Sequence, residues 1–130
     1  MTTTSEAVTQ GIRVSVRARF SDQNSDPHGR QWVFLYTITI QNESPVRVQL
    51  LKRHWVITDA NGEIEEVKGP GVVGKQPILE PGQSFEYTSA CPLKTPFGSM
   101  HGTYQMLGPG NEAFDAEIAG FALRLPGTMQ

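Results

Sequence analysis

Residues 12–20 read IRVSVRARF, and their alternation is the main evidence for the fold class. Apolar side chains occupy every second position from Ile12 to Phe20, with serine or arginine between them. Successive side chains of a strand point to opposite faces of a sheet, so this alternation predicts a half-buried β-strand. Its outer face carries Arg13, Arg17 and Arg19. We expect this basic face to be solvated, with contact to an acidic partner as the alternative.

The next strand signal, at residues 32–40, reads WVFLYTITI and is rich in aromatic and β-branched residues on both faces. Burial on both faces is typical of a central strand. Further alternating runs occupy residues 48–58, 63–68, 85–89, 102–107 and 114–125. Because turn signals recur about every ten residues, we predict an all-β protein, an immunoglobulin-like or fibronectin type III-like antiparallel β-sandwich of about seven strands.

Two local signals refine this topology. The Asn-Gly pair at residues 61–62 predicts a hairpin with a type I′ turn, in which both central residues take positive φ. The strand that returns from it, residues 63–68, is heavily charged, as is usual for a protected sheet edge. Near the end of the chain the apolar parity switches between Ile118 and Phe121, which predicts a β-bulge at residues 119–120.

The chain has 130 residues, which fits a single domain. We expect the β-sandwich to span residues 11–125. A flexible N-terminal tail, residues 1–10, and a C-terminal tail, residues 126–130, would flank it.

Charge and cysteine content narrow the possible partners and the location. Eleven Lys and Arg against 13 Asp and Glu give a net charge of −2. This balance supplies no electrostatic reason to bind nucleic acid or an anionic membrane. Cys91 is the only cysteine, which excludes an intrachain disulfide and suits a reducing compartment. The sequence shows neither a signal peptide nor an apolar run long enough for a membrane helix, so we expect a cytoplasmic protein.

The most conspicuous motif is a glycine-rich segment in which Gly69, Gly71 and Gly74 match the dinucleotide-binding pattern G-x-G-x-x-G, followed by Lys75. That pattern works when a helix begins directly after it and points free N–H groups at a pyrophosphate. Two nearby prolines prevent such a helix here. We therefore interpret the segment as a loop that crosses between the sheets, with an anion-binding nest of backbone amides and Lys75 as the alternative.

No catalytic or metal-binding pattern is visible. His28, His54 and His101 are widely separated, and none forms a short ligand pair with Cys91. The serines lie outside a nucleophile-elbow motif, and Cys91 lacks a nearby histidine in the sequence that would activate it. We predict a buried, inert thiol, no catalytic residue, no metal ligand, no cofactor and no enzymatic activity.

Ordered motifs between about residues 11 and 125 resemble the ApaG family. They are RHWVITD at 53–59, NG at 61–62, GPGVVGKQP at 69–77, LEPG at 79–82, FEYTS at 85–89, GSMHGTYQM at 98–106, and the phenylalanines Phe114 and Phe121. Each motif alone is weak, but their order and spacing cover nearly the whole chain.

The resemblance implies a fibronectin type III-like sandwich and no established enzymatic activity. It also implies an association with cobalt and magnesium homeostasis in bacteria, and gene neighbours that include a diadenosine tetraphosphate hydrolase. In eukaryotes it implies modules in F-box proteins and in a DNA polymerase delta-interacting protein.

We expect a non-catalytic protein–protein interaction module with an unidentified protein partner. Its recognition surface would combine the glycine-rich segment with the strand residues Arg53 and Trp55, because loops on a rigid sandwich can change contacts without endangering the core. An exposed sheet edge also offers a route to a homodimer. Two alternatives stay open: a binder of pyrophosphate-containing nucleotides at Gly69, Gly71, Gly74 and Lys75, and a sensor of divalent cations such as Co²⁺ or Mg²⁺.

Overall fold

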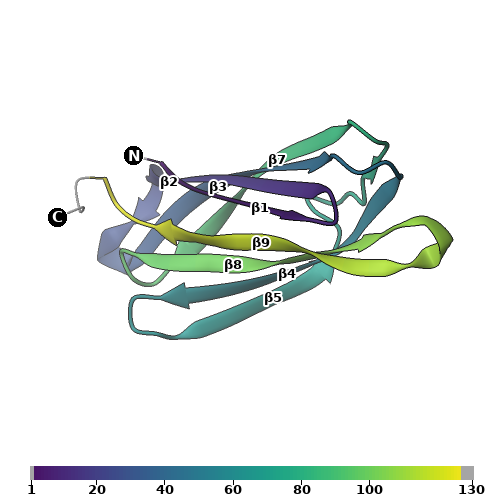
Figure 1. Ribbon diagram of the computed structural model, residues 1–130. Helices are drawn as coiled ribbons and strands as arrows, with labels where there is room; N and C mark the ends of the chain where they lie inside the picture. The colour runs from purple at the N-terminus through teal and green to yellow at the C-terminus, as the bar shows by residue number, and fades with distance from the viewer. Residues whose placement is uncertain (1, 127–130) are drawn as a thin grey trace.

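The structure is a computed structural model that describes residues 2–126, which form two antiparallel β-sheets packed face to face (Figure 1). The strand order is β1-β2-β3-β7 in one sheet and β5-β4-β8-β9 in the other, with β6 paired to β4. The strands are β1 (Thr3–Thr9), β2 (Ile12–Asp26), β3 (Gln31–Asn42), β4 (Val48–Asp59), β5 (Ile64–Pro70), β6 (Ile78–Leu79), β7 (Ser84–Leu93), β8 (Gly98–Leu107) and β9 (Ala113–Leu123). The predicted antiparallel β-sandwich is confirmed.

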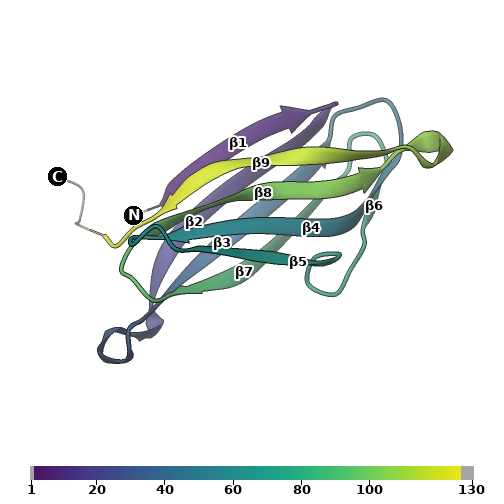
Figure 2. The same ribbon diagram turned by 90° about the horizontal axis from the view of Figure 1, so that it is seen from below.

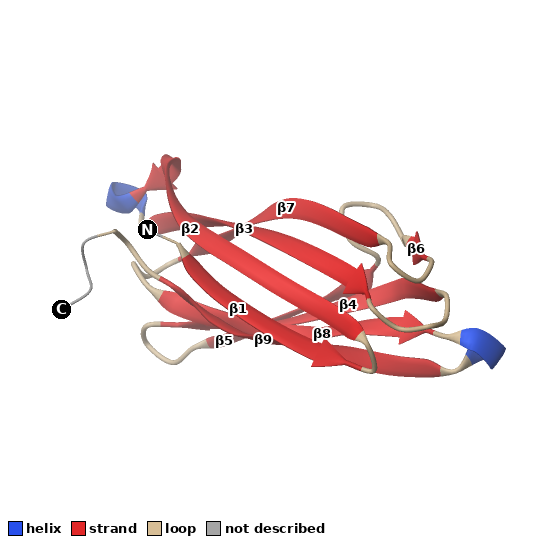
Figure 3. Cartoon of the chain, turned by 45° about the horizontal axis from the view of Figure 1, so that its top comes forward, coloured by secondary structure: helices blue, strands red, loops and turns tan. Residues whose placement is uncertain are grey.

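Helical structure within residues 2–126 is limited to two single-turn 3-10 segments, Pro27–Gly29 and Pro109–Asn111, at opposite ends of the sandwich (Figure 3). In this part of the chain, no helix has the length and apolar character needed to cross a bilayer.

The space between the sheets is filled by the apolar side chains that alternate along the strands, as the sequence predicted. The most deeply buried side chains include Ile12, Val14, Phe34, Ile38, Ile40, Leu50, Tyr104, Met106 and Ile118. At the centre Trp55 packs its ring edge-on against Tyr36, Tyr104 and Phe121, with ring centroids 5.3, 6.4 and 6.0 Å away. Edge-to-face aromatic pairs of this kind stabilise a core beyond the area they bury.

The prediction of a flexible tail at residues 1–10 is wrong, because Thr3–Thr9 form β1 and pair with β2 from Thr3↔Ala18 to Thr9↔Ile12. The strand is held by backbone pairing and by short polar side chains that reach the other sheet. Ser5 Oγ, for example, donates to the carbonyl of Ala119 at 2.7 Å. A strand held in this way has no apolar alternation, which is why it was missed. Of the predicted C-terminal tail, residues 127–130 lie outside the described residues.

The hairpin at residues 61–62 is confirmed, but its predicted type I′ turn is wrong. Only Gly62 has a positive φ, 81°, and its amide donates to the carbonyl of Asp59 at 3.1 Å. The Asp59 carboxylate accepts hydrogen bonds from the amides of Asn61 and Glu63, at 2.8 and 3.0 Å. These bonds fix a longer turn in which Asn61 does not need the left-handed conformation.

The predicted bulge near residues 119–120 is confirmed. The register between β8 and β9 shifts between Met100 and Gly102, so that Met100 faces Phe121 while Gly102 faces Ile118. Ile118 and Phe121 are both buried even though they differ in parity. The extra residue returns the end of β9 to the core.

Candidate functional site

The two long sides of the sandwich, where edge strands of the two sheets lie next to each other, differ in structure. In Figure 2, β1 and β9 run along the upper side, and β5 and β7 along the lower side. On the β1/β9 side, side chains of β1 bond directly to β9. On the β5/β7 side, no hydrogen bond within residues 2–126 joins the two edge strands, and a groove of about 1100 Å³ is lined by residues of both sheets, including Ile57 and Leu93. We call these the closed side and the open side.

Arg53 lies at the open side and holds the end of β5 and the start of the segment that follows it by hydrogen bonds. Its Nη1 donates to the carbonyls of Pro70 and Gly71, at 2.9 and 3.0 Å. The guanidinium passes directly over Gly69, where an added Cβ would lie 3.1 Å from Nη1 and Nη2. Glycine at position 69 therefore leaves room for the arginine, and this packing role explains the first glycine of the motif.

Residues 71–77, which we call the glycine loop, are held by main-chain hydrogen bonds. The amide of Gly71 donates to Leu51 O at 2.9 Å, and Val72 and Lys75 exchange amide-to-carbonyl bonds of 2.8 and 2.9 Å. Gln76 Nε2 adds a bond to the same Leu51 carbonyl at 2.9 Å. Gly71 has a φ of 63°, and a Cβ there would lie 2.2 Å from Lys75 O, so the close approach requires glycine.

The loop continues into the short strand β6, and the helix that a dinucleotide site needs is not formed there, as the prolines predicted. The predicted crossing between the sheets is wrong, because β5 and β6 both pair with β4. The amides of Gly71, Val72 and Lys75 already donate to protein carbonyls. A phosphate nest uses amides that are free to donate. This geometry does not favour the nucleotide alternative, which stays a prediction.

The tip of the loop exposes an apolar side chain in a strained conformation. Val73 and Gly74 have φ values of 43° and 77°, the two positive values that a type I′ turn requires. Val73 is 55% exposed, and Ile78 just beyond the loop is 52% exposed. Lys75 is also exposed beside them. The sequence analysis did not identify Val73 as a candidate. The available signal was a β-branched residue directly before Gly74, in a segment predicted to turn.

The prediction that Trp55 lies on the recognition surface is wrong. It is 2% exposed and lies in the core between the sheets. Arg53 and Trp55 are two residues apart on β4, so their side chains leave the strand on the same face, the one that points toward the other sheet. Arg53 reaches solvent only because its long side chain extends over Gly69 to the edge of the sheet.

Beneath Arg53 lies a group of buried hydroxyl and thiol side chains that stay protonated. Burial raises the pKa of Tyr87 and of Tyr104, whose hydroxyls hydrogen-bond to each other, and the charge of Arg53 opposes this shift. Burial also raises the pKa of the Cys91 thiol to about 12. Cys91 is buried, as predicted, and at neutral pH it carries no thiolate nucleophile.

The histidines offer no metal centre in the described part of the chain. His54 lies on the outer face of its sheet, with Nε2 at 2.6 Å from Glu66 Oε1. Within residues 2–126, no three His, Cys, Asp or Glu side chains are grouped so that they could hold a metal ion. The predicted lack of catalysis and of a cofactor stays a prediction.

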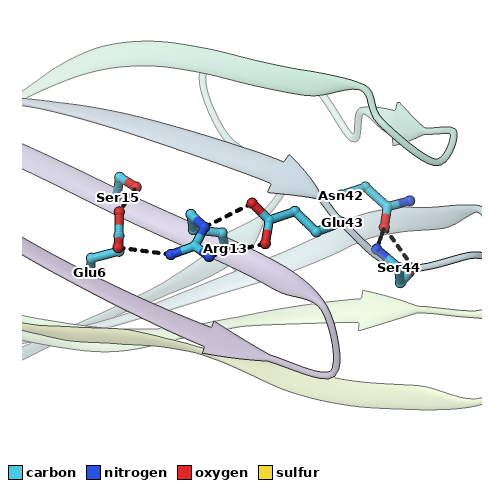
Figure 4. Close-up of polar contacts among 6 residues, drawn as sticks. All are labelled: Glu6, Arg13, Ser15, Asn42, Glu43 and Ser44. Carbon is cyan, nitrogen blue, oxygen red and sulfur yellow. Dashed lines mark hydrogen bonds and ion pairs between the residues drawn. The ribbon is translucent and has the colours of Figure 1, made fainter.

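Acidic residues of the same chain bind part of the predicted basic face (Figure 4). Arg13 lies between Glu6 and Glu43, with Nη1 at 2.8 Å from Glu6 Oε2 and Nε at 2.8 Å from Glu43 Oε2. Arg17 lies 3.7 Å from Glu86. The bond from Arg13 holds the pKa of Glu43 below its usual value. These contacts favour an intrachain role for Arg13 and Arg17.

Comparison with known proteins places this architecture in a family. A sequence model described as the ApaG domain matches residues 22–108, which contain Arg53, β5 and the glycine loop. The chain is 58% identical over 125 residues to Protein ApaG of Anaeromyxobacter sp. strain K, covering 96% of this chain and 98% of that protein. The chain belongs to the ApaG family. Protein ApaG of Brucella anthropi is 53% identical over 120 residues, 92% of each chain.

Solved structures agree with the ApaG assignment. The crystal structure of an ApaA protein from Bordetella pertussis superposes with a TM-score of 0.88 at 46% identity, covering 94% of this chain and all of that one. The C-terminal domain of wzt superposes with a TM-score of 0.55 at 9% identity, covering 97% and 80% of the two chains. At that identity the likeness to wzt shows the fold alone.

Proposed function

We propose that this ApaG-family protein is a non-catalytic interaction module that presents the tip of the glycine loop, on its open side, to a partner protein. The observation that carries the proposal is Val73, an exposed apolar side chain held at a φ of 43°. The left-handed conformation costs a non-glycine residue about 1–2 kcal/mol, and it is least favourable for a β-branched one. Glycine would avoid that cost, and asparagine would reduce it. A valine that contacts a partner accounts for the strain and the exposure together.

The bracing of the loop supports the same role. Arg53, Gln76 and three backbone amides hold the loop in one conformation before any partner arrives. A preorganised loop loses little conformational entropy on binding, so more of the contact energy appears as affinity. Val73 and Ile78 offer apolar contacts, and Lys75 adds a positive charge. We infer a partner surface with an apolar pocket bordered by acidic side chains.

Affinity purification with matched valine variants tests the proposal. Val73→Thr removes apolar surface at the loop tip but keeps a β-branched side chain. Val8→Thr makes the same change on β1 of the closed side, where the valine is 49% exposed. Each bait is used under native conditions, in several growth states that include metal stress, and retained proteins are quantified by mass spectrometry.

A specific protein should be retained by the wild type and by Val8→Thr, and reduced at least about tenfold by Val73→Thr, as for an interface anchor. Failure to retain any specific protein in all growth states would contradict the proposal. Equal retention by Val73→Thr and the wild type would place the contact elsewhere and would also contradict it.

A further inference from the structure

We propose that the free edge of β5 pairs with β5 of a second copy of this chain, antiparallel and around a two-fold axis at Val67. The pairing would join the β5-β4-β8-β9 sheets of two molecules into one continuous sheet. It uses the strand edge and not the tip of the glycine loop, so it is independent of the partner proposed above.

The hydrogen bonds to β4 identify which groups of β5 are free. Gly71 N donates to Leu51 O, and Asp59 N donates to Glu63 O, at the two ends of the β4–β5 pairing. Since hydrogen-bonding direction alternates along a strand, the odd-numbered residues of β5 face β4. The N–H and C=O groups of Glu66 and Lys68 therefore point away from β4. Pro70 is consistent with this, because its carbonyl accepts a bond from Arg53 at the open side.

β5 lies at the end of its sheet order, and Figure 2 shows it at the border of the sandwich. An unpaired edge of this kind can accept another extended strand through main-chain hydrogen bonds. In a symmetric antiparallel pair, the hydrogen-bonded positions must be residues whose groups are free on both strands. Glu66 and Lys68 satisfy that condition for each other.

Charge then selects one register. A two-fold axis at Glu66 would set two glutamates opposite each other, and an axis at Lys68 would set two lysines opposite each other. An axis at Val67 sets Glu66 of each copy opposite Lys68 of the other, on the outer face of the joined sheet. Opposite charges directly across a strand pair stabilise it, and like charges destabilise it. The strand is therefore complementary to itself in the Val67 register.

The neighbouring contacts fit this register. Glu66 binds His54 through Oε1, which leaves Oε2 for a lysine of the second copy. At the ends of the pairing, Ile64, which is 66% exposed, would meet Pro70 of the second copy. Pro70 has no N–H, and its carbonyl is bound by Arg53, so the hydrogen-bonded ladder ends there. The other open-side edge, β7, carries Glu86 as its one charged residue and has no such complementarity.

A short ladder buries less area than the roughly 1,200 Å² of a stable interface, so we expect a weak dimer seen between about 10 µM and 1 mM. Sedimentation equilibrium over this range tests it with E66K, K68E, their double variant and an equimolar mixture of the two single variants. E65K is the matched control, because it makes the same charge change one residue away, at a position whose backbone faces β4. Circular dichroism checks that each variant is folded.

The wild type and E65K should dimerise alike. Each single variant places like charges opposite each other twice and should weaken self-association at least about tenfold. The mixture and the double variant should both recover it, because each restores opposite charges across the pair. A monomeric wild type at 1 mM would overturn the proposal. So would unchanged dimers of both single variants, or a mixture that stays monomeric.

A measurement on the wild type alone remains decisive if a variant fails to fold. Amide hydrogen exchange at Glu66 and Lys68 should slow as the protein concentration rises through the same range, because pairing protects those two N–H groups. Exchange at these amides that is independent of concentration would overturn the proposal. Neither outcome depends on whether a partner binds Val73, so the two proposals can fail separately.

Discussion

The closed and open sides of the sandwich border the same two sheets but leave their edge strands in different states. On the closed side, Thr3 and Ser5 donate to carbonyls of β9, and Thr9 Oγ1 accepts from Glu117 N at 3.0 Å. On the open side, Arg53 braces the loop after β5, and the charged strand itself keeps a free edge. A few hydroxyl groups therefore join the edge strands of the two sheets along the closed side, beside the apolar core that packs the sheets together. The opposite edge then stays available for contacts with other molecules.

The largest effect should come from a substitution that prevents the close approach of Gly71 to the carbonyl of Lys75 in the glycine loop. Gly71→Ala places a Cβ against the carbonyl of Lys75 at a φ of 63°, so the loop must move. We expect a loss of about 3 kcal/mol or more in the free energy of unfolding, measured by urea denaturation. Gly62→Ala is the matched control, since its φ of 81° is similar but no atom lies within 4 Å of the new Cβ. It should cost only about 1 kcal/mol, and equal losses in the two variants would show that the approach to Lys75 does not matter.

A smaller effect should follow when the closed side is opened. The double variant Ser5→Ala/Thr9→Ala removes two hydrogen bonds between β1 and β9, and each is worth about 1 kcal/mol. Thr4→Ala changes the exposed face of the same strand and should cost less than about 0.5 kcal/mol. If the double variant were as stable as Thr4→Ala, these two hydrogen bonds would not stabilise the contact between β1 and β9.

The smallest effect should be on the loss of stability at acidic pH, through the bond between Arg13 and Glu43. The bond from Arg13 lowers the pKa of Glu43 in the folded protein, so this carboxylate stabilises the fold above its unfolded pKa. The contribution is lost as the pH falls through the lowered folded pKa. Glu43→Gln should therefore reduce stability slightly at pH 7 and flatten its decline below about pH 4.5. Superimposable pH profiles of the variant and the wild type, from thermal unfolding, would contradict this.

The sequence was informative wherever burial creates alternation. Ile12 to Phe20 predicted the inner face of β2, and the parity switch between Ile118 and Phe121 predicted the bulge in β9. β1 could not be predicted in this way, because it is held by backbone pairing with β2 and by hydroxyl groups such as Ser5 Oγ, which bonds to a strand more than a hundred residues away. Side-chain alternation does not report such long-range polar contacts.

The candidate site was predicted only in part, for a related reason. The glycine motif located the loop only in part, because Gly69 and Pro70 still belong to β5. The prolines correctly excluded a helix after it. The position of Arg53 over Gly69 depends on the register in which β4 pairs with β5. Alternation of apolar residues within one strand does not predict that register. Trp55 was predicted at the surface as an aromatic strand position near the loop, but it lies on the inner face of β4 and is buried. Arg53 shares that face and reaches the edge of the sheet only because its side chain is long.

Residue-resolved amide hydrogen exchange of the dilute protein tests most directly whether the open side presents a loop of fixed conformation. The amides of Gly71, Val72 and Lys75 should be protected to an extent comparable with strand amides of β8, because each donates to a main-chain carbonyl. Exchange of these three amides at the rate of unstructured peptide would contradict a preorganised loop.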